Sequence, residues 1–93
     1  MIIRVGTVEL FLADSQSLKQ KRQVVNSLKE RLRNRFNLAV AEIDHLELWQ
    51  RSALALATVS NESANADEVI QKAMSFIEND GRAQVIDCYV EER

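Results

Sequence analysis

Residues 2–35 read IIRVGTVELFLADSQSLKQKRQVVNSLKERLRNR, and the hydrophobic period changes once within this stretch. The run 2–12 is rich in β-branched and apolar residues with partial alternation, which predicts a strand. Ser17, followed three residues later by Gln20, forms a capping-box pattern that opens a helix. That helix is expected to run to about Arg35, because its apolar residues fall within an arc of about 120°. The residues of this arc are Leu18, Val24, Val25, Leu28 and Leu32.

Two further strands follow this helix. The runs 38–45 and 52–60 are predicted strands, joined by a loop that contains Trp49. In the second run Leu54 and Leu56 alternate with alanines. We therefore expect one bulky face and one smooth face that a helix approaches closely.

A second helix and a last strand complete the chain. Ser60 and Asn61 are the predicted caps of the helix, and Asn79-Asp80-Gly81 is predicted to end it, with glycine in the left-handed conformation. The last strand spans about residues 83–91. Its core-facing residues are predicted to be Ile86, Cys88 and Val90.

The order βαββαβ predicts an α+β, ferredoxin-like sandwich, with a four-stranded antiparallel sheet and both helices on one face. The chain has 93 residues, 46% hydrophobic and 28% charged, which fits a single domain over residues 1–93 and leaves no room for a second. The single Cys88 cannot form an internal disulfide, and no window approaches 18 apolar residues. We therefore expect a cytoplasmic protein that neither contacts a membrane nor is exported.

Charge is strongly segregated along the sequence. Residues 17–36 hold seven basic residues and one acidic residue, a net charge of +6, whereas the rest of the chain has a net charge of -8. This asymmetry favours an anionic partner, and we expect RNA or the ribosome to be contacted through phosphates. An acidic protein or a merely solvated helix face are the alternatives. The candidate contacts are Lys19, Lys21, Arg22, Lys29, Arg31, Arg33 and Arg35.

No catalytic, cofactor or metal site is predicted. The chain lacks a Cys-x-x-Cys pair and a glycine-rich loop, and residues 53–59 contain no aromatic side chain for base stacking on the sheet. The only cluster with acid–base or metal-binding chemistry surrounds His45. Glu42 and Asp44 are expected to share one face of a strand while His45 points to the other, so the three side chains do not converge.

Four residues are candidates for binding a protein partner. Trp49 is interpreted either as a lid over the end of the core or as an exposed anchor. Phe11 and Tyr89 are expected on the sheet face without helices, where an apolar patch would favour self-association. Arg51, next to the tryptophan loop, is the fourth candidate. The alternative function is thus a self-associating interaction module, a homo-oligomer with no role in nucleic-acid binding.

The long basic run 17–37 resembles the basic helix of the YlxP-like family of short bacterial proteins. The similarity continues through Val40-Ala41-Glu42, Leu48-Trp49-Gln50-Arg51 and Val59-Ser60-Asn61, but the tail after Asp80 matches no pattern of that family. The resemblance implies a ferredoxin-like fold and a function that is undefined. Genes of this family lie, in some bacteria, among translation and ribosome-maturation genes, which favours an RNA- or ribosome-associated role.

Overall fold

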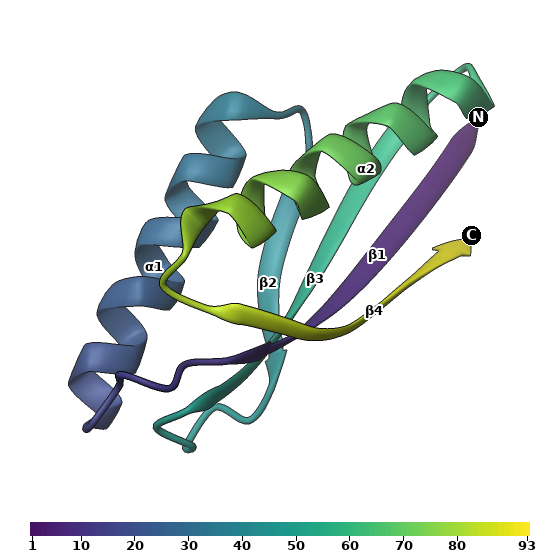
Figure 1. Ribbon diagram of the computed structural model, residues 1–93. Helices are drawn as coiled ribbons and strands as arrows, with labels where there is room; N and C mark the ends of the chain where they lie inside the picture. Colours follow the sequence, from purple (N-terminus) through teal and green to yellow (C-terminus); the bar gives the residue numbers. More distant parts are fainter.

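The computed structural model describes residues 1–93 as a four-stranded antiparallel sheet with two helices on one face (Figure 1). The strand order is β2-β3-β1-β4, so β1 and β3 are central and β2 and β4 are edges. This arrangement confirms the predicted α+β, ferredoxin-like fold. The elements are β1 (Ile2–Phe11), α1 (Leu18–Arg35), β2 (Ala39–Asp44), β3 (Arg51–Ser60), α2 (Ser63–Asp80) and β4 (Gln84–Glu92).

The core lies between the helices and the leucine face of the central strands. Leu54 and Leu56 of β3 are fully buried and lie opposite Val8 and Gly6 of β1. Ala55, by contrast, belongs to the face that carries no helix, which we call the open face. The expectation that a helix approaches the smooth alanine face was therefore wrong. The helices cover the leucines because burying these larger side chains removes more apolar surface from water.

The two helices begin differently. Ser17 caps α1 as predicted, since its Oγ accepts a hydrogen bond of 3.1 Å from the backbone N–H of Gln20. The predicted caps of α2, Ser60 and Asn61, were wrong by one or two residues. Glu62 occupies the cap position without a side-chain capping bond, and Ser60 Oγ accepts from the Glu62 N–H at 3.1 Å. Neither helix has the length of apolar sequence needed to cross a membrane.

The last strand, β4, is an edge that α2 leaves largely uncovered (Figure 1). Gly81, with φ of 85°, ends α2 in the predicted left-handed conformation. Cys88 lies opposite Val8, on the face toward the helices, as alternation predicts. The predicted burial of Ile86, Cys88 and Val90 was nevertheless wrong, because all three are exposed. The predicted direction of Ile86 was wrong as well, since a register shift leaves it unpaired and places Val85 opposite Leu10, against the core. Alternation fixes the side of a sheet to which a residue points, but burial also requires a helix above it.

Candidate nucleic-acid interface

Helix α1 carries a line of cations on the flank that faces β2. We call Lys19, Arg22, Lys29 and Arg33 the basic stripe. Lys29 is half-buried and the other three side chains are exposed. Arg33 Nη2 donates to the carbonyl oxygen of Val40 at 2.8 Å, which places the stripe beside the edge strand β2. From Lys19 to Arg33 the stripe extends about 21 Å along the helix axis.

Every lysine or arginine without a carboxylate partner lies on α1. Of the twelve Lys and Arg residues, seven form ion pairs and five form none. All five unpaired cations lie on α1, although α1 contributes only about a fifth of the chain. They are Lys19, Arg22, Lys29, Arg33 and Arg35.

The cations outside α1, and Arg31 on α1, are engaged by neighbouring acids. The hydrogen bond from Arg82 lowers the pKa of Asp80 below its usual value although burial opposes this, and Asp80 in turn raises the pKa of Arg82. Arg31 adds a second cation to this carboxylate at 3.1 Å. Lys72, hydrogen-bonded to Glu68, lowers the pKa of that carboxyl. Uncompensated positive charge is therefore concentrated on one helix.

One predicted RNA contact is wrong. Lys21 has a fully buried side chain, so it cannot meet a phosphate. Its Nζ donates to Glu42 Oε2 at 2.7 Å and to the carbonyl oxygens of His45 and Leu46 at 3.1 and 3.2 Å. These partners use all three donors of the ammonium group. Lys21 instead fixes α1 to β2 and to the loop that follows it.

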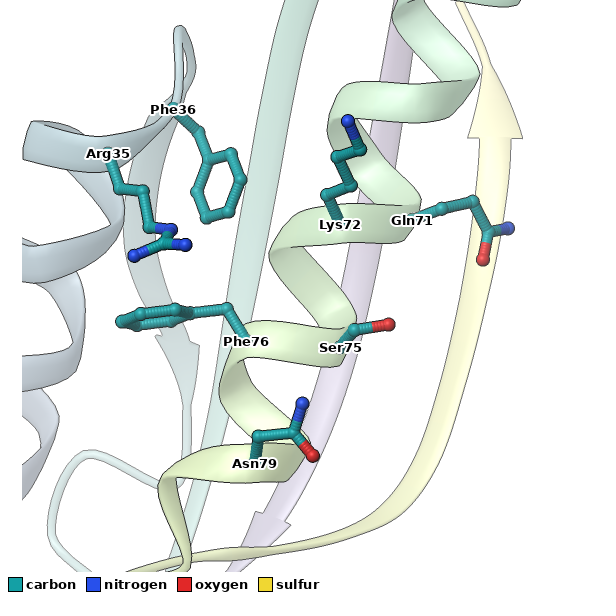
Figure 2. A pocket seen from close by; sticks show the side chains of 7 residues that line it. All are labelled: Arg35, Phe36, Gln71, Lys72, Ser75, Phe76 and Asn79. Atoms are coloured by element: carbon teal, nitrogen blue, oxygen red, sulfur yellow. The ribbon is translucent and has the colours of Figure 1, made fainter.

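The predicted contacts Arg31 and Arg35 lie on the opposite flank of α1, toward α2. The Arg35 guanidinium carbon lies 6.0 Å from the ring centroid of Phe36 and 5.5 Å from that of Phe76, and Arg31 lies 5.5 Å from Phe76. Figure 2 shows the Arg35 guanidinium between the two rings. Sequence reasoning did not find this cluster, because the contact between Phe36 and Phe76 depends on how α1 packs against α2.

The acidic residues near His45 are arranged differently from the prediction. A register shift separates Glu42 from Asp44, so that Glu42 lies opposite Leu54 on the helix-covered face. Asp44 lies opposite Ala53 on the open face. The expectation that Glu42 and Asp44 share a face was therefore wrong. Two-residue spacing keeps side chains on one face only where the strand has no bulge.

His45 instead meets two residues that the sequence analysis had not connected with it. Its Nε2 lies 3.1 Å from Glu9 Oε1, and Arg51 Nη2 lies 3.2 Å from the same oxygen. His45 has a left-handed φ of 62°, and its backbone N–H donates to Asp44 Oδ1 at 2.7 Å. None of the five cavities is lined by Glu42, Asp44 or His45. The cluster is a polar network on the open face built around the Arg51–Glu9 ion pair, and a non-enzymatic role stays a prediction.

The candidate protein-binding residues do not form one patch. Phe11 and Arg51 are cross-strand neighbours on the open face, where both are half-buried. Tyr89 lies on the same face, opposite Thr7 on β1, and is 50% exposed. Trp49 belongs to the β2–β3 loop and is 56% exposed, which does not fit the lid interpretation. The open face thus unites three of the four candidates.

Comparison with known proteins gives two consistent matches. A family model described as "Protein of unknown function (DUF503)" matches residues 3–90. Over 78 residues the chain is 32% identical to the uncharacterized protein YlxP of Bacillus subtilis (strain 168). That alignment covers 84% of this chain and 85% of the relative. The family model therefore reaches all six elements of the fold, including α1.

Proposed function

The chain belongs to the DUF503 family of proteins of unknown function, and we propose that it is a non-enzymatic RNA- or ribosome-associated protein that contacts phosphates through α1. One observation carries the proposal: every lysine or arginine without a carboxylate partner lies on that helix. The extended basic stripe suits a polyanion, whose phosphates repeat along its length.

The energetics of α1 support this proposal. The first turn of the helix holds no acidic residue, and Lys19 lies there, where the helix dipole disfavours positive charge. Lys29 and Arg33 are like charges at a four-residue spacing, which costs a few tenths of a kcal/mol. A phosphate backbone offsets both costs, since each cation that contacts a phosphate also releases a condensed counterion.

The test is the salt dependence of binding to ribosomal subunits and to single-stranded RNA. If each of the five unpaired cations of α1 contacts one phosphate, the slope of log affinity against log salt is about -3.5, at about 0.7 per contact. Between about 50 and 200 mM salt the affinity should therefore fall about 100-fold. The same titration with a variant that lacks part of the stripe then locates the contact.

The informative variant is Lys29→Glu with Arg33→Glu. Loss of two contacts should reduce the slope to about -2 and lower the affinity at 50 mM salt by about tenfold or more. The matched control combines Arg93→Glu, Asn61→Asp and Gln84→Glu, all exposed and outside α1, which lowers the net charge by the same amount. If the control loses as much affinity as the stripe variant, the attraction follows net charge and the footprint on α1 is wrong.

A second candidate function rests on the open face. Val59 and Tyr89 are 55% and 50% exposed on the uncovered side of the sheet. This favours a self-associating module with no role in nucleic-acid binding. If the protein self-associates in this way, light scattering should detect a concentration-dependent dimer. Tyr89→Glu or Phe11→Glu should abolish it. A monomer at high concentration would exclude it, whereas a dimer combined with no RNA binding would favour it over the RNA proposal.

A further inference from the structure

The end of α1 that meets α2 carries a cluster of aromatic and basic side chains. We call Arg31, Arg35, Phe36 and Phe76 the aromatic corner. The rings of Phe36 and Phe76 lie edge to face, with centroids 5.9 Å apart and planes at 79°. Both rings are half-buried against the core. The corner therefore combines a fixed apolar base with positive charge at its surface.

Arg35 differs from the other cation of the corner. Arg31 is held by Asp80 at 3.1 Å, whereas Arg35 is exposed and has no carboxylate partner. Its guanidinium group lies beside the rings of Phe36 and Phe76. A guanidinium group over an aromatic ring is a planar surface on which a further aromatic group stacks.

A surface cavity of about 490 Å³ opens at this corner (Figure 2). Its lining holds Arg35, the two phenylalanine rings and Lys72, whose ammonium group is paired with Glu68 at 2.6 Å. The remaining lining groups are the neutral donors and acceptors of Gln71, Ser75 and Asn79. Two neighbouring cavities share Arg35. One is lined by Arg31, Asn34, Arg35 and Phe76, and the other, which also borders Phe36 and Lys72, includes Glu68 in its lining. This chemistry suits a flat aromatic group with hydrogen-bonding edges and an attached negative charge.

We propose that the aromatic corner binds an unpaired base of single-stranded RNA, which stacks on Arg35 and on the exposed part of Phe36. The inference rests on the proposed function and assigns it a substrate class. Arg33, the last cation of the stripe, and Arg35 lie on opposite flanks of the last turn of α1, so one strand reaches both by passing around the C-terminal end of the helix. A base inside a duplex is stacked on its neighbours and cannot enter, whereas an unpaired base is free to do so.

The test separates stacking from charge with Arg35→Lys, which keeps the positive charge and removes the planar group. The ligands are an oligouridine strand of about 20 nucleotides and an abasic ribose-phosphate strand of equal length. Arg35→Lys should bind oligouridine about fivefold to tenfold more weakly than the parent, within the range for loss of one stacked base. Its salt slope, and its affinity for the abasic strand, should match the parent. Arg93→Lys, an equally conservative change outside α1, should behave as the parent on both strands.

Three results would overturn the proposal, and they differ in what else they imply. If Arg35→Lys matches the parent on oligouridine while Lys29→Glu with Arg33→Glu still loses affinity, the stacking site is wrong and the phosphate footprint stands. If the parent binds the abasic strand as tightly as oligouridine, no base is recognised. The proposed phosphate contacts on α1 stand in that case too. If the parent binds neither strand at 50 mM salt, the inference and the proposed function fail together.

Discussion

Replacing Lys21 by methionine tests the role of the buried ammonium group. Methionine keeps the length and apolar stem of the side chain but removes every hydrogen bond that Nζ makes. Glu42 is only 11% exposed on its side chain, so the substitution leaves a nearly buried carboxylate without its cation. The carbonyl oxygens of His45 and Leu46 lose a donor as well.

The expected loss of stability follows from this geometry. Removing one partner of a buried ion pair costs about 3–5 kcal/mol. Ser52 Oγ still donates to Glu42 Oε2 at 2.7 Å, and the carboxylate has some solvent access, so the cost should be near the lower bound, about 3 kcal/mol. A domain of 93 residues has a total stability of about 5–14 kcal/mol, so the change is a large fraction of the whole.

Urea denaturation followed by circular dichroism measures this loss. The matched control is Lys19→Met, an exposed cation on the same helix, which should change the free energy of unfolding by less than about 0.5 kcal/mol. Adding Glu42→Gln to Lys21→Met should restore part of the loss, because the uncompensated charge is gone. A loss below about 1 kcal/mol in Lys21→Met, or no recovery in the double variant, would refute the structural role of the pair.

Three further changes have defined outcomes. Because Arg82 lowers the pKa of Asp80 in the folded state, this carboxylate stabilises the fold fully above about pH 4 and less as pH falls through the lowered pKa. Asp80→Asn should cost about 1–2 kcal/mol at pH 7 and flatten the loss of stability below pH 4 in acid titrations. Gly6→Ala should cost about 1–2 kcal/mol in urea, because the added Cβ would lie 2.7 Å from Met74 Cε; an unchanged midpoint would mean that Met74 moves away freely. Gly81→Ala has open space around it, so a cost of about 1 kcal/mol, measured in the same way, would come from its left-handed backbone alone.

The order of elements was predictable because the hydrophobic period changes clearly at each boundary. The departures occur where neighbours in space decide the outcome. The bulge between Glu42 and Asp44 changes which face a residue occupies, and no residue type in the sequence marks it. Cys88 lies on the predicted side of β4 and is exposed, because the position of α2 above the sheet depends on tertiary packing.

The sequence predicted which helix carries the candidate interface, but it predicted less well which residues of that helix are available for contact. A signal for Lys21 was present: it follows Leu18 by three residues and precedes Val25 by four, which places it on the apolar arc of α1. Its partner Glu42 lies on another element, and nothing local to the helix identifies it. The aromatic corner depends even more on tertiary structure, because Phe36 and Phe76 are forty residues apart.

The buried face of α1, the flank with the basic stripe and the flank toward α2 therefore have different physical roles. The net charge of the helix does not distinguish them. Lys21 and the leucines fix the helix to the sheet, so the backbone positions of the remaining cations are fixed relative to the sheet. The last-turn cations Arg33 and Arg35 are favourable to the helix dipole, and a stability argument alone accounts for them. It does not account for Lys19 in the first turn, or for an acid-poor helix in a chain whose other segments are rich in acids. A bound polyanion would supply the negative charge that Lys19 and the rest of this acid-poor helix lack.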